Sequence, residues 1–547
     1  MHACLQLPEL LSQIIEFLSP DPPWAKGTSN LATLARTCRL FYEPALDALW
    51  EHQSDLGPLI KCMPKDLWDE SEDLESGLLI TFRRPVVPVD WTRFDLYAPR
   101  VKCISYNRSK DREPIRPLTR LHDTVLQALK DRRSTVILFP NLREIHWPST
   151  DKGELFSYLG PTVTSVSFQW PDSESEHGEL GSIGFLTRVV TICPMLEDLQ
   201  INNGDSQGVA FPPSFVETLC LLRHLRHLAC DLVFITTRDV VRMAALPHLT
   251  SLFLAGRSTV DCGTAKGEWS RLIGGAGVSE CPSEAISHPF SNLKHLVIIS
   301  DSPSLDPWIQ MLRFMEQPEL ELFHCYLRQA HHSATIVSLL QILAGRPSHR
   351  ALASLHMDCL SRFEPHFPED ERNSFGNPLH VPSLVKFINL TKFHFIMHHH
   401  FSLDDATIKE LAMAWPLLEE FEVKWPSSAE EWSSVTLEAL VHLAHHCPHL
   451  QTIHLILGTT ILPSLPPSET VNLTVRSLHF GQTPILDPKG VAAFLVGLFP
   501  KLETFCGISA EESIGDSLHA AFGVAWEEVQ RLVTASRLGG SFDGAVP

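Results

Sequence analysis

A short apolar triplet recurs along most of this chain and limits the folds that it can adopt. Its pattern is an apolar residue, two variable residues, a second apolar residue, one variable residue and a third apolar residue, as in Leu450-Gln-Thr-Ile453-His-Leu455. The copies are about 31 residues apart on average, a spacing typical of stacked structural repeats. Fourteen candidates can be identified, and they begin at Val101, Leu142, Val163, Leu196, Leu225, Leu249, Leu293, Leu320, Leu352, Leu390, Leu418, Leu450, Val475 and Leu502.

Helical patterns precede several of these triplets, and a proline separates each helix from its triplet. Clear examples cover residues 408–421, 437–450 and 491–502, with Pro448 and Pro500 at the break in the last two. Because proline cannot continue a helix and favours extended backbone before it, it marks a switch from helix to strand. The alternating apolar residues then predict a short strand with one face in a core. Each unit can bury its apolar face only by stacking on its neighbours, as in a solenoid.

The triplets resemble the leucine-rich repeat, specifically its irregular form. The resemblance covers residues 100–507 and implies an α/β solenoid with a parallel sheet on the concave side and helices on the convex side. An ordinary α/β domain with parallel strands is the alternative. Many members of that family carry Asn or Cys three residues after the triplet, whereas this chain has other residues there, such as Arg257, Asp301, Gly458 and Thr483. We therefore expect irregular curvature, and we expect the insertions at 257–289 and 365–382 to be loops.

The first fifty residues predict three short helices instead of repeats. The first begins near Pro8, which suits the first turn of a helix, and it carries apolar residues at helical spacing. Three prolines within residues 19–23 end it. A second helical pattern runs from Leu31 to Phe41 with residues 29–30 as its cap, and a third runs from Pro44 to Trp50. Three such helices bury little core alone and need a neighbour or a partner.

This segment resembles the F-box, the helical motif that docks a Skp1-type adaptor in cullin–RING ubiquitin ligases. The stretch Thr37-Cys-Arg-Leu-Phe-Tyr42, followed by Pro44 and Ala48-Leu-Trp50, is similar to fungal members of that family. A plain N-terminal cap over the first repeat is the alternative, and one segment can do both. The resemblance implies that the adaptor-binding residues are Leu7, Pro8, Leu10, Leu11, Ile14, Ile15, Leu18, Leu31, Leu34, Phe41, Leu49 and Trp50.

Four regions follow from these patterns. Residues 1–55 form the F-box module, 56–99 a linker or cap with an acidic stretch, 100–507 the repeat array, and 508–547 a capping helix and tail. The combination implies a substrate-recognition subunit of an SCF-type ubiquitin ligase, with a Skp1-type adaptor, a cullin and an unidentified target protein as partners. Such a subunit raises the local concentration of the target and is not itself an enzyme. An interaction scaffold with no ligase role is the alternative.

One column of variable residues stands out within the triplets. The position just before the last apolar residue holds His in six of fourteen copies, although 28 His in 547 residues predict fewer than one. Parallel strands lie about 4.8 Å apart, so these rings are expected to form a row on the exposed sheet face. The companion column, two residues earlier, is small or polar in many copies. We expect the target to contact His324, His356, His394, His454, His479 and Glu422.

Three interpretations of this row remain open. The histidines can be tolerated surface residues, they can form a target-binding strip whose charge changes near neutral pH, or they can bind a metal. Parallel side chains along a sheet do not converge tetrahedrally, so we expect no metal site there. The chain contains no metal-ligand spacing, nucleophile motif or phosphate loop that can be singled out, and we expect no catalytic residues, metal or cofactor.

Composition narrows the partners further. The chain has 44 Lys+Arg and 64 Asp+Glu, a net charge of −20, which argues against nucleic-acid binding. No apolar run reaches the length of a membrane helix, so we expect no membrane association. Thirteen cysteines without a CxxC pair or an apparent signal sequence suggest reduced thiols. We expect a cytoplasmic and/or nuclear protein.

Overall fold

The computed structural model shows a chain that divides into two compact units. One contains residues 1–232 and 246–249, and the other contains residues 233–245 and 250–547. The structure describes residues 7–18, 28–73, 77–105, 119–133, 136–147, 152–169, 178–202, 214–231, 237–256, 289–300, 305–315, 319–328, 333–359, 381–397, 403–424, 434–457, 462–463, 470–480, 485, 487–506 and 517–537. Most of the two expected loop insertions, and the four positions without the family's Asn or Cys, lie outside these residues.

Parallel strands run through both units in sequence order. In the first unit they are β1 (His52–Gln53), β4 (Cys103–Ser105), β6 (Glu144–Trp147), β7 (Ser165–Gln169), β8 (Asp198–Asn202) and β9 (His227–Asp231). In the second unit they are β10 (Ser251–Gly256), β11 (His295–Ser300), β12 (Leu322–Leu327), β13 (Ser354–Cys359), β14 (Lys392–Ile396), β15 (Glu420–Lys424), β16 (Thr452–Leu455), β17 (Ser477–His479) and β18 (Thr504–Cys506). Every one of the fourteen predicted triplets coincides with a strand. Of the strands in this sheet, only β1 was not expected.

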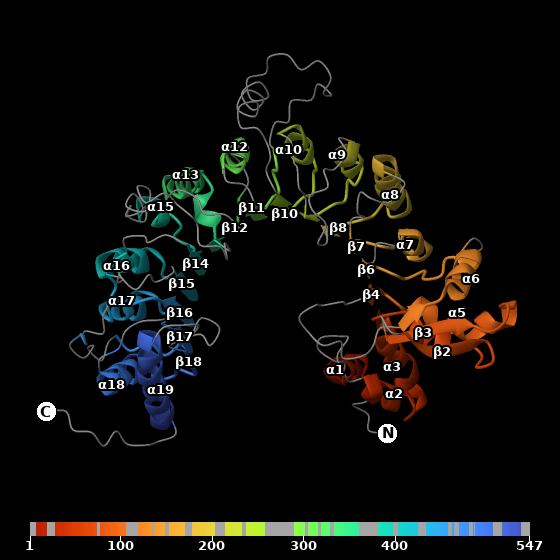
Figure 1. Ribbon diagram of the computed structural model, residues 1–547, viewed down its shortest axis with the longest axis horizontal. Helices are drawn as coiled ribbons and strands as arrows, with labels where there is room; N and C mark the ends of the chain where they lie inside the picture. Colours follow the sequence, from red (N-terminus) through yellow and green to blue (C-terminus); the bar gives the residue numbers. More distant parts are fainter. Residues whose placement is uncertain are drawn as a thin grey trace, which may run out of the picture. The chain divides into compact units, whose positions relative to one another are not determined.

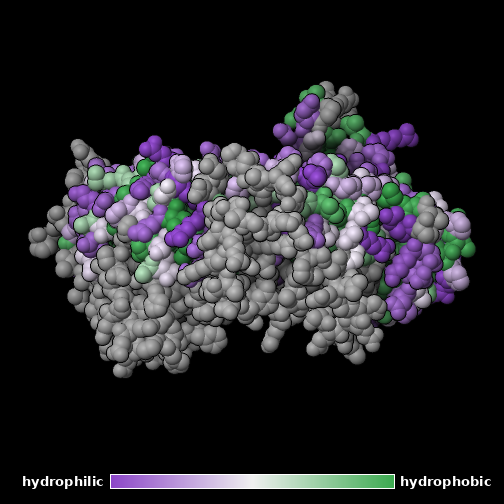
Figure 2. Space-filling view, turned by 90° about the horizontal axis from the view of Figure 1, so that it is seen from above, coloured by the Kyte–Doolittle hydropathy of each residue, from purple (hydrophilic) through white to green (hydrophobic). Residues whose placement is uncertain are grey.

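Helices cover the outer side of the strands in each unit (Figure 1). The first unit contains α6 (Asp123–Arg133), α7 (Lys152–Tyr158), α8 (Gly178–Ile192) and α9 (Ser214–Leu219). The second contains α10 (Thr237–Met243), α12 (Asp306–Phe314), α13 (Ser333–Ala344), η4 (His349–Ala351), α15 (Val381–Leu384), α16 (Asp405–Ala414), α17 (Glu438–His446), α18 (Pro488–Leu498) and α19 (Ser517–Arg537). In the view from above, hydrophilic and hydrophobic residues are mixed across the coloured surface (Figure 2).

The core lies between the strands and these helices. The middle residue of a triplet is fully buried, as Ile145, Leu199 and Phe421 show, and the variable residues on either side of it face away from the core. This alternation, the sequential order of the parallel strands and the outer helices define an α/β solenoid of the leucine-rich-repeat type. Within each unit the sheet forms one layer and the helices the other, as the sequence predicts.

In addition to the backbone pairing of the strands, polar side chains connect successive turns of the solenoid. In four turns, the residue just before the triplet donates a hydrogen bond to a carbonyl of the preceding turn. Each acceptor stands two residues before the first apolar residue of the preceding triplet. These inter-turn braces are Asn141 to Pro99 (2.8 Å), Thr162 to Pro140 (3.0 Å), Asn389 to Arg350 (2.9 Å) and Thr474 to Pro448 (2.9 Å). They satisfy backbone carbonyls between turns, where an unpaired group is costly.

The N-terminal module consists of α1 (Pro8–Leu18), α2 (Thr28–Ala35) and α3 (Arg39–Glu51). The prediction that the second helix reaches Phe41 is wrong, because that helix stops at Ala35. The backbone N–H groups of Arg36 and Thr37 bond to carbonyls three residues back, and the Thr37 hydroxyl donates to Leu34 O at 2.7 Å, which closes the last turn. The expected cap at residues 29–30 is wrong as well, since α2 already begins at Thr28.

Residues 56–99 contain more structure than the sequence indicated. They form α4 (Gly57–Lys61), β2 (Trp68–Asp73), β3 (Gly77–Phe82), η2 (Pro88–Trp91), α5 (Thr92–Tyr97) and η3 (Ala98–Arg100). The acidic stretch is largely exposed, and much of it is the strand β2. It pairs antiparallel with β3, which pairs in turn with β5 (Thr119–Leu121). Cross-strand pairing and ion pairs such as Arg83–Asp69 (2.7 Å) hold this charged edge strand in place.

The last helix closes the C-terminal end of the second unit. The ring of Trp526 in α19 packs against Phe480 and Phe505, with centroids 5.3 and 5.5 Å away. Val529 and Val533 are buried beside it. This helix lies within the region 508–547, where a capping helix is expected, and it covers apolar surface that a final repeat would otherwise expose. Among the helices described, none combines the length and the apolar character needed to span a membrane.

Candidate functional site: the histidine row

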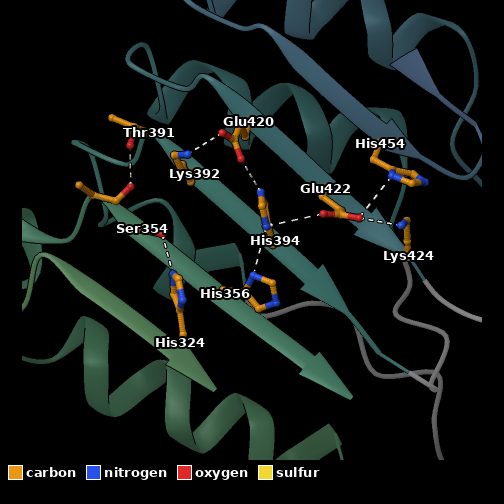
Figure 3. A network of polar contacts seen from close by, with 11 residues as sticks. His324, Ser354, His356, Thr391, Lys392, His394, Glu420, Glu422, Lys424 and His454 are labelled. Carbon is orange, nitrogen blue, oxygen red and sulfur yellow. Dashed lines mark hydrogen bonds and ion pairs between the residues drawn. The ribbon is translucent and has the colours of Figure 1, made fainter. Parts of the chain in front are cut away.

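Six side chains form a continuous row across the sheet of the second unit, as the sequence predicts. Figure 3 shows five of them, from His324 to His454. The strand register places His324, His356, His394, Glu422, His454 and His479 directly opposite one another in that order, from β12 to β17. We call this set the histidine row. On β11 the row is preceded by Val297, which lies opposite Phe253 of β10. His146 lies in the first unit, between Ser105 and Ser167.

The rings of the row contact each other at the spacing of the strands. The centroids of His324 and His356 are 5.2 Å apart, and those of His356 and His394 are 5.1 Å apart. His454 and His479 stack with centroids 4.9 Å apart. The ring of Tyr326 joins them, 4.9 Å from His356. The result is a surface of flat, hydrogen-bonding rings on a rigid sheet.

Two carboxylates organise the polar contacts at the centre of the row. Glu422 lies 2.7 Å from Lys424 Nζ and 3.3 Å from His454 Nδ1, and its other oxygen is 3.6 Å from His394 Nδ1. Glu420, two residues earlier on the same face of β15, accepts from His394 Nε2 at 3.0 Å and from Lys392 Nζ at 2.6 Å. Each carboxylate thus has one lysine and at least one histidine as partner.

Burial and these partners shift the pKa values of three histidines in the row. Burial, with the neighbouring His356 and His394, lowers the pKa of His324 to about 4. Burial also lowers the pKa of His394 and of His479, although Glu422 opposes the shift in both. These three rings are therefore less readily protonated than an ordinary histidine, which argues against a change in their charge near neutral pH.

Glu422 shifts in the direction that favours its charged form. Burial alone would raise the pKa of this carboxyl, but hydrogen bonds from His454 and Lys424 outweigh it and lower the pKa to about 2. The side chain is only 19% exposed. The row therefore combines three rings of lowered pKa with a fixed, compensated negative charge at Glu422.

The hydrogen bonds also determine the tautomers of two rings. His394 Nε2 donates to the Glu420 carboxylate, so a neutral His394 has a bare Nδ1. That nitrogen lies 3.1 Å from His356 Nδ1, which must then carry the hydrogen. His356 Nε2 is consequently bare, and it has no hydrogen-bond partner among the described residues. It lies 3.8 Å from an Asp358 oxygen, so a proton added to it would be shared with that carboxylate.

The companion column lies two residues before the row on each strand, and none of its residues was among the predicted target contacts. Ser354, Lys392, Glu420, Thr452, Ser477 and Thr504 occupy consecutive strands in register. The small members fit the prediction, and Ser354 accepts or donates a 2.9 Å hydrogen bond with His324 Nε2. Lys392 and Glu420 are charged, and they complete the network. Their positions two residues before the row would have identified them, because the same register applies to both columns.

The predicted adaptor-binding residues of the N-terminal module lie partly in its core and partly on its surface. Leu11, Ile15 and Leu31 form its core, and Leu18, Leu34, Phe41 and Leu49 pack against it. Trp50 is also buried and stacks on Tyr97 with centroids 4.6 Å apart. Leu7 and Leu10 are exposed and Ile14 is half-buried. The side chain of Pro8 lies outside the described residues.

A second apolar stripe of α1 faces away from this core. Leu7, Leu10, Ile14 and Phe17 are spaced three, four and three residues apart, which places them on one side of a helix. Leu7 is 51% exposed and Phe17 is 89% exposed. Leu40 and Tyr42 of α3 are exposed as well. Phe17, Leu40 and Tyr42 were not among the predicted contact residues, although the helical spacing of Phe17 could have indicated it.

The module is attached to the array through α3. Arg100 of η3 forms ion pairs with Glu43 (2.5 Å) and Asp47 of α3. The chain then continues from α3 into β1, which pairs with β4 of the array. The module therefore continues directly into the first turn of the solenoid, while the apolar stripe of α1 stays exposed.

No protein-family model and no curated protein sequence matches this chain. Among solved structures it resembles an internalin from Listeria monocytogenes, with 13% identity and a TM-score of 0.32 over 70% of this chain and 94% of the internalin chain. A structure of the Toll–Spatzle complex from Drosophila matches with 10% identity and a TM-score of 0.30, over 67% of this chain and 44% of the other.

The leucine-rich-repeat ectodomain of the receptor kinase GASSHO1/SCHENGEN3 from Arabidopsis thaliana gives 10% identity and a TM-score of 0.21, over 77% and 60% of the two chains. Similarity at this level carries no conclusion about activity or partners. The strand order and register of the chain itself establish its leucine-rich-repeat-type solenoid fold.

Proposed function

We propose that this chain is the substrate-recognition subunit of an SCF-type ubiquitin ligase. Its N-terminal module docks a Skp1-type adaptor, which links it to a cullin, and its sheet face binds a protein target that is still to be identified. The chain acts by bringing target lysines close to the ubiquitin-charged enzyme, which requires no bond-making residue of its own. The cytoplasm or the nucleus is the compartment in which such a complex works.

The observation that carries the proposal is the exposed apolar stripe of α1. Leaving Leu7, Leu10 and Phe17 in water is unfavourable, and such patches mark interaction sites. Covering one large apolar side chain contributes about 1.5–3 kcal/mol. The module needs α3 to attach to the array, so α1 is available for a partner. These properties, together with the resemblance of residues 7–50 to an F-box, support an adaptor as that partner.

The experiment measures binding of the purified chain to a Skp1-type adaptor by isothermal titration calorimetry. We expect binding at micromolar concentration or below. In the variant Leu10→Ala/Phe17→Ala the affinity should fall by about 100-fold, since each lost tenfold corresponds to about 1.4 kcal/mol. Leu221→Ala is the matched control, because Leu221 is 63% exposed in a different turn of the array.

Each result has a clear meaning. Equal loss of affinity in Leu221→Ala would show a non-specific effect of exposed leucines. Absence of adaptor binding by the unmodified chain would overturn the ligase role and leave an interaction scaffold as the function. Leu11→Ala is a poorer test because Leu11 lies in the core of the module, and its loss would destabilise the fold.

The histidine row supports a protein as the target. Its rings combine apolar faces with hydrogen-bonding edges, which suits a protein surface. Lys392 and Lys424, beside the row, are already paired with Glu420 and Glu422. These two lysines therefore offer little to a phosphate backbone. This balance supports the proposal that nucleic acid is not the ligand.

A further inference from the structure

A second cluster of reactive side chains lies on the sheet face of the first unit. It consists of Cys103 on β4 and of Glu144 and His146 on β6. The register places Cys103 opposite Glu144, and His146 follows two residues later on the same face. The cysteine sulfur, a carboxylate oxygen of Glu144 and a ring nitrogen of His146 all lie within 4.8 Å of one another. Cys103 is buried, His146 is half-buried and Glu144 is exposed, so the cluster opens toward the sheet surface.

Within the described part of the chain, no basic side chain compensates the charge of this cluster. Glu51 pairs with Lys102 at 3.1 Å, whereas Glu144 has no lysine or arginine at ion-pair distance among the described residues. A carboxylate, a thiol and an imidazole therefore meet at a place where a cation would be favourable.

We propose that Cys103, Glu144 and His146 bind a divalent transition-metal ion of the Zn²⁺ type. A thiolate, an imidazole and a carboxylate are the donors that Zn²⁺ takes in proteins, whereas Mg²⁺ and Ca²⁺ take oxygen donors. Bond lengths of about 2.0–2.3 Å in a tetrahedral site require donors about 3.3–3.6 Å apart, so rotations that move these atoms by about one ångström complete the geometry. On binding, the thiol proton is released to solvent and the sulfur–metal bond replaces the sulfur–hydrogen bond.

Among the described residues three protein donors converge here, which leaves a fourth position on the exposed side of the sheet. A water molecule fills such a position in three-ligand zinc sites. The histidine row does not form such a site. Within the described part of the chain, no other set of three such donors converges as closely. The site therefore adds a function to the array that does not depend on adaptor docking or target binding.

The test uses Co²⁺ as a spectroscopic substitute for Zn²⁺ on the full-length chain after removal of metal with a chelator. One equivalent of Co²⁺ should give a thiolate-to-cobalt charge-transfer band in the near ultraviolet, and Zn²⁺ should displace it. The band should disappear in Cys103→Ser. His146→Ala and Glu144→Gln should weaken Zn²⁺ binding by at least 10–100-fold, which is the loss seen for residues that only support a ligand.

Matched controls separate this site from the many other thiols and imidazoles. Cys38→Ser removes a half-buried cysteine and His227→Ala an exposed strand histidine, and neither should change the band. Circular dichroism checks that each variant is folded. If Cys103→Ser does not fold, the two surface variants decide by their Zn²⁺ affinities. A band that persists in Cys103→Ser, unchanged affinities in His146→Ala and Glu144→Gln, or no band in the unmodified chain would overturn the proposal.

Discussion

Glu422 carries the fixed negative charge at the centre of the histidine row. Its neighbours Lys424 and His454 hold the pKa of the carboxyl at about 2 against the effect of burial. The group is therefore ionised in the native state over the whole physiological range. Its ordinary value in an unfolded chain is 4.5. The carboxylate stabilises the fold fully above that value, and its contribution is lost as the pH falls toward 2.

Glu422→Gln tests this contribution. At pH 7 the variant should unfold with a free energy lower by about 1–3 kcal/mol, because it loses charge-assisted hydrogen bonds in a half-buried site. The difference should narrow below about pH 4.5, where the unfolded carboxyl becomes protonated. Urea denaturation at several pH values measures it. Glu410→Gln, on the exposed face of α16, is the control, and equal losses in the two variants would contradict the account.

His324 provides the opposite case, a base that folding makes harder to protonate. Its pKa falls from 6.5 to about 4, so the native state binds fewer protons than the unfolded state between these values. Stability from this residue is complete above pH 6.5 and is lost as the pH falls toward 4. From pH 7.5 to pH 5 the loss should be roughly 1–2 kcal/mol, and it should be absent in His324→Gln. Denaturation of the unmodified chain and of His324→Gln at the two pH values measures this loss of stability. His449→Gln is the exposed control. If His324→Gln has the same pH dependence as the unmodified chain, the lowered pKa of His324 is excluded.

At the scale of elements, the turns of the solenoid are joined by backbone pairing and by the inter-turn braces. The braces replace a ladder of asparagines that the sequence lacks after its triplets. Thr474 shows how one works, since its hydroxyl lies 2.9 Å from Pro448 O and 2.8 Å from Leu450 O. Its neighbour Asn472 bonds to the carbonyls of Ala444 and Cys447 in the same preceding turn.

Thr474→Val should lower the free energy of unfolding by about 0.5–1.5 kcal/mol, the usual net value of one hydrogen bond. Valine keeps the shape of the side chain and removes the hydroxyl, so the inter-turn carbonyls lose a donor. Thermal and urea denaturation measure the change. Thr534→Val is the control, because the Thr534 hydroxyl donates to Gln530 O within α19 and so contributes to the helix itself. A loss of the same size in both variants would show that the brace is not responsible.

Sequence reasoning predicted the array well because its signal is periodic. Each triplet combines strand alternation with a fixed spacing, so all fourteen strands and the order of the histidine row followed from one register. The same reasoning failed for strands whose pairing partner is distant in sequence or whose own residues are mostly polar. The strand β2 is almost entirely charged or polar on its exposed surface and depends on β3 for its hydrogen bonds. No local pattern identifies such a strand.

The candidate sites show the same division. The row could be predicted, whereas the charged companions Lys392 and Glu420 required both columns to be compared across turns. Cys103 and Glu144 are far apart in sequence, and only the aligned register of β4 and β6 brings them together. The shifts in pKa could not be predicted, because they depend on how deeply each ring is buried and on which carboxylate it faces.

At the scale of the whole molecule, the proposed activities occupy separate places. The exposed stripe of α1 belongs to the N-terminal module, and the histidine row belongs to the second unit. A substrate receptor needs such a separation, because adaptor and target must bind at the same time. Variants at one place should therefore leave binding at the other unchanged.

Quantitative crosslinking and mass spectrometry of the tagged chain in cells test this most directly. Leu10→Ala/Phe17→Ala should lose the Skp1-type adaptor and keep the target, while His356→Ala/His394→Ala/His454→Ala should keep the adaptor and lose the target. A matched set on α17, His442→Ala/His445→Ala/His446→Ala, should lose neither. Retention of the adaptor by the first variant, or of an unchanged target set by the second, would contradict the account.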